Sequence, residues 1–255
     1  MGKTKRAGDG TWAAAPATKP VGVLYVVGTP LGNLADLSAR ASETLGKVDF
    51  VVAEDTRQAK KLLHYLDVKK PVDSFHAHSP PRKAKEIVER LRQGQSAALV
   101  TDAGMPVVSD PGAELVAAAV AHGVAVSVIP GPSAVSAALA VAGFPADRYV
   151  FWGFLPRTGK ARRAALLDIA EDRRTAVIFE APHRILRFLD DVAPLLGERP
   201  LAVCRELTKM HEEVLRGSAA NVAQALRDQF GAAPRGEFTV VVGPVLGDGG
   251  GQGGV

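Results

Sequence analysis

Four short loops in the first half of the chain combine glycine and proline with acidic or other polar residues, and each follows a run rich in apolar, β-branched residues. Glycine allows a backbone to approach a ligand closely, and proline fixes the shape of a loop in advance. Open α/β sheets bind ligands at the carboxyl ends of their parallel strands. The pattern therefore predicts a small-molecule cleft built from residues 28–33, 54–57, 102–112 and 130–133.

The composition of these loops argues against a phosphate-binding site. No G-x-G-x-x-G motif follows a strand, and no G-x-x-x-x-G-K-[ST] motif occurs. The third loop carries Asp102 and Asp110 where a phosphate would need a cation. Carboxylates suit hydroxyl and ammonium groups, as in an adenosine that carries an amino acid and no phosphate. Each Asp also has an equally good interpretation as an ordinary turn residue, because Asp beside Gly or Pro is common in turns.

Alternating strands and helices must position these loops. Helix 37–45 follows Asp36 as its predicted N-cap, and helix 82–93 ends before Gly94 as at a C-cap. Such alternation favours a parallel sheet covered on both faces. The strands are expected at residues 21–27, 49–53, 97–101 and 124–129, and the remaining helices at 56–66, 112–122 and 133–142.

Longer helical stretches separate the strands of the second half. Strands are expected at residues 149–154, 176–180, 201–205 and 237–242, with helices at 183–196 and 219–229. We therefore expect the α/β class, with an N-terminal α/β domain over residues 21–132 and a C-terminal α/β domain over residues 133–244. The polar residues 1–20 and the glycine-rich residues 245–255 are expected to be disordered.

Composition restricts the class of protein. The 255 residues are 47% hydrophobic with a net charge of +4, which permits a polyanionic partner without requiring one. No apolar run approaches the ~18 residues of a membrane span, and residues 1–20 lack the apolar segment of a secretory signal, so a cytoplasmic protein is expected. The single cysteine, Cys204, lies in a predicted strand and is expected to be a core thiol.

A metal site is not expected. His76 and His78 alternate like a ligand pair, but no further Cys or His supports them. They are expected either to face the cleft or to be solvated surface histidines.

Seven ordered motifs resemble those of the tetrapyrrole methylase superfamily, and the resemblance covers roughly residues 21–243. Within the superfamily, they are most similar to the branch that methylates the ribose 2′-hydroxyl of a decoding-centre cytidine in 16S rRNA. The motifs are GTPLGNLAD from Gly28, AEDTR from Ala53, TDAGMP from Thr101 with SDPG from Ser109, PGPSA from Pro130, GFLP from Gly153, FEAPHR from Phe179 and RELTK from Arg205.

This resemblance implies a fold and an activity. It implies two α/β domains with S-adenosylmethionine in the cleft between them, a homodimer, and methylation of 16S rRNA in the small ribosomal subunit. Two alternatives are kept. One is a related methyltransferase that acts on a small tetrapyrrole or a protein side chain, and the other is a non-catalytic ribosome assembly factor.

The resemblance also implies the cofactor contacts. Met105 stands where the family usually has threonine, so a hydroxyl contact is lost while backbone contacts persist. Many members continue in a helical C-terminal segment where this chain has its glycine-rich residues. The implied cofactor-binding residues are Pro30, Asp102, Ala103, Gly104, Met105, Pro106, Asp110, Ser133, Ala134, Phe179, Glu180, Ala181, Glu206, Leu207, Gly236 and Thr239.

Methyl transfer to a hydroxyl needs alignment and the removal of one proton. Lys209, Arg57 and Glu212 are the expected catalytic residues, with Asp55 and the two histidines as further candidates for the proton acceptor. Asp55 has the alternative role of a helix N-cap. Substrate RNA is expected to contact Asn33, Arg57, Arg157, Lys160, Arg162 and Arg163. The alternative for the last four, which crowd into seven residues, is a solvated helix face.

Overall fold

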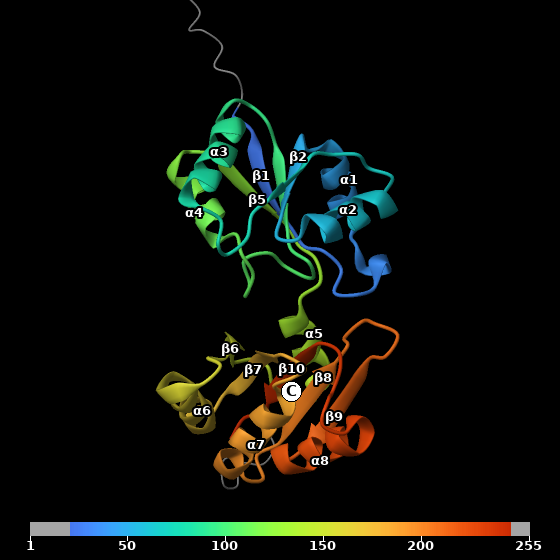
Figure 1. The fold of residues 1–255 in the computed structure, drawn as a ribbon, viewed down its shortest axis with the longest axis vertical. Helices are drawn as coiled ribbons and strands as arrows, with labels where there is room; N and C mark the ends of the chain where they lie inside the picture. Colours follow the sequence, from blue (N-terminus) through green and yellow to red (C-terminus); the bar gives the residue numbers. More distant parts are fainter. Residues whose placement is uncertain (1–20, 246–255) are drawn as a thin grey trace, which may run out of the picture.

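The computed structural model describes residues 21–245, which form two five-stranded sheets, one above the other along the long axis (Figure 1). All the strand pairs of the first sheet are parallel. Its strand order is β3-β2-β4-β1-β5. The strands are β1 (Val23–Val27), β2 (Phe50–Ala53), β3 (Val72–Ser74), β4 (Ala97–Val100) and β5 (Ala125–Ile129).

Alternation along β2 shows why the first sheet is covered on both faces. Phe50 and Val52 belong to a core cluster with α3 and α4, whereas Val51 and Ala53 belong to one with α1 and α2. Successive strand residues point to opposite faces, so an all-apolar strand is buried by helices on both sides. The predicted two-sided parallel sheet is confirmed. The helices are α1 (Ala39–Lys47), α2 (Thr56–Tyr65), α3 (Pro81–Arg92) and α4 (Ala113–Ala121).

The second sheet is mixed, with strand order β6-β7-β10-β8-β9. Only β6 and β7 are parallel, while β10 runs antiparallel to both β7 and β8, and β9 antiparallel to β8. Helix α5 (Ala134–Ala142) packs on one face and the other three helices on the opposite face. The further elements are β6 (Tyr149–Phe154), α6 (Gly159–Glu171), β7 (Thr175–Glu180), α7 (Ile185–Leu196), β8 (Leu201–Arg205), β9 (Glu213–Gly217), α8 (Ala219–Phe230) and β10 (Phe238–Val242).

Some local expectations need correction. Ser38, not Asp36, caps α1, because Asp36 ends a short 3₁₀ helix, η1 (Leu34–Asp36). The two edge strands β3 and β9 and helix α6 were not expected. Edge strands are short and partly polar, so their hydrophobic alternation is weak.

The domain division at 132/133 stays a prediction. The first sheet ends at Ile129, the second begins at Tyr149, and α5 between them contacts the second sheet. The expected disordered segments lie outside the described residues, except Val245, whose amide donates to the Arg173 carbonyl at 3.1 Å. Within residues 21–245, no helix combines the length and apolar character needed to cross a membrane.

Candidate cofactor and active site

Two loops cross backbone against backbone at the carboxyl edge of the first sheet. A β-carbon on Gly28 would lie 2.6 Å from the Gly131 nitrogen, so neither loop has room for a side chain there. The next residue, Thr29, exchanges two backbone hydrogen bonds with Gly104 at 2.9 and 3.1 Å. The first, third and fourth loops are therefore fixed to one another before any ligand binds.

The third loop holds a strained backbone. Val107 and Ser109 have φ values of 76° and 64°, a region that non-glycine residues, and β-branched ones above all, rarely adopt. Backbone strain of this kind persists only where neighbours impose it, and it gathers at functional sites. Ser109 also reaches the second sheet, because its Oγ lies only 2.7 Å from where a β-carbon on Gly153 would be.

A cavity of about 350 Å³ lies between the carboxyl edge of the first sheet and the second sheet. Its walls are mostly apolar, and two carboxylates, Asp102 and Asp110, enter from the third loop. The structure brings eleven of the sixteen predicted cofactor residues to this cavity: Asp102, Ala103, Gly104, Met105, Asp110, Ser133, Ala134, Phe179, Glu180, Ala181 and Thr239.

The other five predicted cofactor residues do not line the cavity. Pro30, Pro106 and Leu207 are buried in the loops. Glu206 packs over Gly236, where a β-carbon would meet its Cγ at 2.7 Å, and accepts a hydrogen bond from the Glu237 amide. Glu237 does line the cavity, so Glu206 and Gly236 shape its rim from outside.

The acidic residues at this edge lack enough positive charge to neutralise them. The pKa of Asp110 is raised to about 6, first by burial and then by the negative charges of Glu54 and Asp102. The pKa values of Glu54 and Asp102 are also raised, in both cases chiefly by burial. A cationic group in the cavity would relieve this repulsion.

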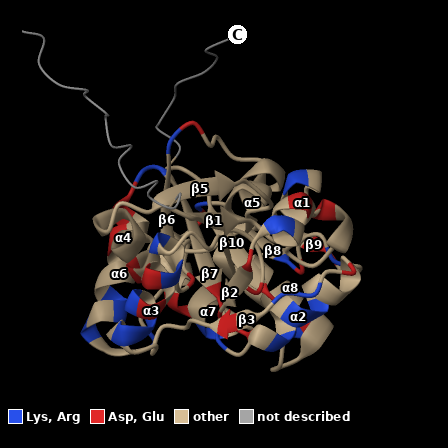
Figure 2. Cartoon of the chain, turned by 90° about the horizontal axis from the view of Figure 1, so that it is seen from above, with Lys and Arg blue, Asp and Glu red and all other residues tan. Residues whose placement is uncertain are grey.

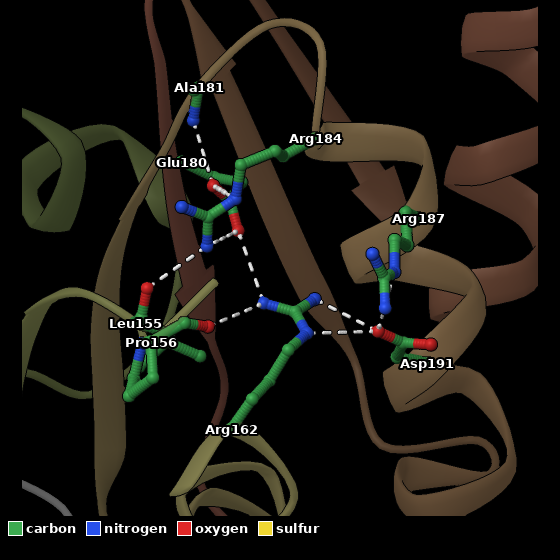
Figure 3. A network of polar contacts seen from close by, with 8 residues as sticks. All are labelled: Leu155, Pro156, Arg162, Glu180, Ala181, Arg184, Arg187 and Asp191. Carbon is green, nitrogen blue, oxygen red and sulfur yellow. Dashed lines mark hydrogen bonds and ion pairs between the residues drawn. The ribbon is translucent and has the colours of Figure 1, made fainter. Parts of the chain in front are cut away.

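Glu180 belongs to a buried ion-pair network beneath the cavity (Figure 3). Its side chain is 0% exposed and pairs with Arg184 at 2.9 Å and with Arg162 at 3.8 Å. Arg184 also donates to the Leu155 carbonyl at 3.0 Å. The network therefore joins the ends of β6 and β7 with α6 and α7, and the Glu180 carboxylate is already neutralised.

The expectation that Arg162 contacts RNA is wrong. Its side chain is 5% exposed and bonds Asp191 on α7 at 2.9 Å. Helix α6 buries Arg162 together with Leu166 and Ile169, on the face that meets the core. Its neighbours Arg157, Lys160 and Arg163 are exposed and stay available to a polyanion.

The predicted catalytic residues do not converge on one point. Lys209 lies at the rim, with its Nζ 3.0 Å from carboxylate oxygens of both Glu206 and Glu237. Burial lowers the pKa of Lys209, but the hydrogen bonds to these two carboxylates outweigh it and raise the pKa overall. The ion pairs with both carboxylates therefore favour the protonated form of Lys209. Glu212 is exposed and accepts the Thr208 amide at 2.6 Å.

Arg57 and Asn33 lie at the N-terminal ends of two helical segments near the cavity, α2 and η1. Arg57 is 86% exposed and pairs with Asp55 at 2.7 Å. Asp55 caps α2 by accepting the Arg57 amide at 2.8 Å, and its pKa is lowered to about 2, first by the hydrogen bond from the Arg57 side chain. Asn33 is exposed and caps η1. Each thus has a structural role that does not exclude contact with a substrate.

The remaining polar candidates lie outside the cavity. His76 and His78 are exposed, and the His76 ring accepts the His78 amide. Among residues 21–245, no cluster of three or more His, Cys, Asp or Glu is arranged to hold a metal ion. Cys204 is fully buried and burial raises its pKa to about 11, so it is a core thiol as predicted.

The sequence profile of the tetrapyrrole (corrin/porphyrin) methylases matches residues 23–223. The chain belongs to this family. The predicted methyltransferase fold and enzyme class are confirmed. Among tetrapyrrole methylases, it is 44% identical over 222 residues to the ribosomal RNA small subunit methyltransferase I of Thermotoga maritima, covering 87% of this chain and 98% of that protein. It is 45% identical to the protein of the same name from Mycobacterium tuberculosis, covering 87% of this chain and 77% of that protein.

Solved structures of other proteins share the fold at low identity. A diphthine synthase superposes with a TM-score of 0.66 at 16% identity, covering 87% of this chain and 89% of that one. A cobalt precorrin-4 methyltransferase superposes with a TM-score of 0.65 at 20% identity, covering 87% of this chain and 94% of that one. At such identities the likeness concerns the fold alone.

Eight further residues line the cavity beside the eleven predicted ones. Ser109 begins the SDPG motif, so the resemblance to the family could have identified it. Phe154 ends β6, and only the strand order brings it to the cavity, whereas Glu237 and Phe238 lie between the predicted contacts Gly236 and Thr239. The eight are Leu31, Val108, Ser109, Val135, Phe154, Pro182, Glu237 and Phe238.

Proposed function

We propose that this chain methylates small-subunit (16S) rRNA with S-adenosylmethionine as the methyl donor, at the ribose 2′-hydroxyl of a decoding-region cytidine. The observation that carries the proposal is the 44% identity to a ribosomal RNA small subunit methyltransferase I along 98% of that relative's length. Because rRNA is the substrate, a cytoplasmic location belongs to the same proposal.

The cavity suits this cofactor by size and charge. When bound, S-adenosylmethionine supplies a methyl group on a positively charged sulfur. The unneutralised Asp102 and Asp110 favour a cation, while the apolar walls and the exposed Phe154 suit an adenine ring. Asp102, Asp110, Ser133, Phe179 and Thr239 are the residues proposed to hold it.

The cationic rim is proposed to orient the RNA. Lys209 is held protonated by Glu206 and Glu237, so it stabilises negative charge on the substrate instead of accepting the hydroxyl proton. Arg57 and Glu212 are kept as substrate-aligning residues, together with Asn33. The exposed Arg157, Lys160 and Arg163 are proposed as phosphate contacts.

Cofactor binding is tested by rebuilding the third loop. Asp102→Ala with Pro106→Gly removes a carboxylate and loosens the turn. We expect S-adenosylmethionine affinity, measured by calorimetry, to fall at least about 10-fold. An unchanged affinity would show that this cavity is not the cofactor site.

Substrate class is tested by competition. The family's fold also occurs in a diphthine synthase and a precorrin methyltransferase, so a tetrapyrrole and a protein side chain are the alternatives to RNA. Labelled S-adenosylmethionine offered with both small ribosomal subunits and tetrapyrroles should label the subunits alone. Cofactor binding without transfer to any substrate would favour a non-catalytic assembly factor.

A homodimer is proposed on the edge of the first sheet. The outermost strand β5 leaves Val128 56% exposed, and Val120 on the adjacent helix α4 is 62% exposed. An uncovered edge strand with apolar neighbours is a site for self-association. Light scattering at micromolar concentration should give twice the 26.7 kDa chain mass. A mass near that of one chain would contradict the dimer.

A further inference from the structure

Helix α2 carries positive charge without negative charge. Its ten residues include Arg57, Lys60, Lys61 and His64 and no carboxylate. All four of these side chains are exposed, while Ala59 and Leu63 face the core. Positions three, four and seven residues apart share one side of a helix, so the four form a stripe along its outer face. In Figure 2 the ribbon of α2 carries Lys and Arg residues, coloured blue.

The stripe continues into a groove at the far end of the helix. The groove encloses about 450 Å³ and is lined by Lys60, Leu63, His64, Val68, Lys69, Lys70 and Pro71. The described residues that line it include no carboxylate. Two acids neighbour the lining residues: Asp67, which is exposed and precedes Val68 in the chain, and Asp49, whose carboxylate is held by Ser96 and interacts with the charge of Lys70.

The other end of the stripe reaches the cofactor cavity. Asp55 caps α2, and the charges of Asp55 and Arg57 both act on the pKa of Asp102, which lines the cavity. Since each helical residue rises about 1.5 Å, the ten residues of α2 extend about 15 Å from that edge. A polyanion whose reacting group sits at the cavity would meet Arg57, Lys60 and Lys61 in succession along α2.

Helix α3, on the opposite face of the same sheet, makes a useful contrast. It also carries exposed cations, Arg82, Lys85 and Arg92, but Glu86 and Glu89 lie among them. Glu89 pairs with Arg92 at 3.1 Å. Positive charge on α3 is therefore partly neutralised, whereas that on the outer part of α2 is not.

We propose that the outer face of α2 and the Lys69–Lys70 loop form the docking surface for the phosphate backbone of the substrate RNA. The proposal rests on the proposed rRNA methylation. It assigns the leading part of RNA binding to the first domain. Sequence alone had placed the phosphate contacts chiefly after β6.

The test compares two triple variants that remove the same charge from opposite faces of one sheet. The docking variant is K60Q/K61Q/K69Q, and the control is R82Q/K85Q/R92Q. Glutamine retains helix propensity, so both should fold. Binding to small ribosomal subunits is titrated at several salt concentrations, and KM and kcat are measured with labelled S-adenosylmethionine.

The slope of log affinity against log salt concentration should be smaller in magnitude for the docking variant by about 2 to 3. Each lost phosphate contact accounts for about 0.7–0.9 of that change. The docking variant's KM for the subunit should rise at least about 10-fold, while kcat at saturating RNA and cofactor affinity stay unchanged. The control variant should change this slope by less than the ~0.7–0.9 that one phosphate contact contributes. Equal effects of the two variants, or an unchanged slope in the docking variant, would overturn the proposal.

Failure of docking can be told from failure of the proposed function. A wild-type enzyme that methylates the subunit while K60Q/K61Q/K69Q behaves like the control would reject α2 docking alone. A wild-type protein that binds the subunit through α2 but transfers no methyl group would reject the methylation and support the docking surface.

Discussion

The aliphatic part of Lys209 lies directly against Gly32. A β-carbon on Gly32 would overlap the Lys209 Cγ and would lie 2.7 Å from its Cε. Gly32 belongs to the first loop of the first sheet, and Lys209 follows β8 of the second. Because Lys209 also pairs with Glu206 and Glu237, its position depends on both halves of the molecule.

Gly32→Ala should displace Lys209 without unfolding the protein. The φ of Gly32 is outside the left-handed region, so alanine is tolerated by the backbone, and the obstacle is a flexible side chain. We expect kcat to fall about 10-fold or more with little change in Tm. Thermal melting and single-turnover methyl transfer measure the two effects.

The matched control for Gly32→Ala is a double-mutant cycle with Lys209→Ala. If Gly32 acts through Lys209, the double variant should be no slower than Lys209→Ala alone. Rate losses that multiply would show that the two residues act independently.

Arg162→Met should destabilise the protein, whereas Arg163→Met should not. Removing Arg162 leaves Asp191 without this ion-pair partner and leaves Glu180 less neutralised. Breaking a buried ion pair costs about 3 kcal/mol of folding free energy. Arg163 is exposed, so its replacement should change the free energy of unfolding by less than about 0.5 kcal/mol. Urea unfolding of the two variants provides the comparison, and equal stabilities would refute the network's structural role.

Affinity for S-adenosylmethionine should fall as the pH drops through about 6. The Asp110 carboxyl, whose pKa burial raises to about 6, attracts a cation only when ionised. Calorimetry between pH values of about 5 and 8 should show the weakening in the wild type. Asp110→Asn should bind more weakly at neutral pH, with a flatter pH profile. A variant with the full wild-type profile would exclude Asp110 as its source.

The ionised carboxylate of Asp110 should also lower the free energy of unfolding at neutral pH. Its folded pKa lies above the unfolded value near 3.8, so its stabilising contribution exists at low pH and is lost as pH rises towards 6. Asp110→Asn should therefore stabilise the free protein by about 1–2 kcal/mol above pH ~7 and by little below pH ~4. Urea unfolding at the two pH values tests the sign, and destabilisation at neutral pH would contradict it.

Gly28→Ala should disrupt the crossing of the first and fourth loops. The new methyl group would meet the Gly131 backbone and the Met105 Sδ, which lies 2.7 Å from that position. Met105→Ala removes the sulfur but not the backbone, so it should not rescue cofactor binding in Gly28→Ala. Rescue would show that the side chain, not the loop crossing, sets the constraint.

The sequence predicted the first sheet well because its signals are local. Short apolar runs such as Val51 to Ala53, and loop glycines such as Gly104, can be recognised from a few neighbouring residues. One edge strand of each sheet was missed, β3 in the first and β9 in the second. Strand β9 mixes Glu213 and Arg216 with apolar residues, and its place beside β8 depends on a distant antiparallel pairing.

The spacing of apolar residues after Arg162 indicates that its side chain is buried. Leu166 and Ile169 follow it by four and seven residues, which places all three on one helical face. That spacing separates Arg162 from the exposed Arg163. Its partner Asp191 lies 29 residues away on α7, and no local pattern identifies it.

Locating the transferred methyl group tests the proposed 2′-O-methylation of 16S rRNA directly. The protein is incubated with labelled S-adenosylmethionine and small ribosomal subunits that lack the modification, and the 16S rRNA is then digested to nucleosides and fragments for mass spectrometry. The account predicts one 2′-O-methylcytidine per subunit, in a fragment of the decoding region. Label in a methylated base, in protein, or in no product would contradict it.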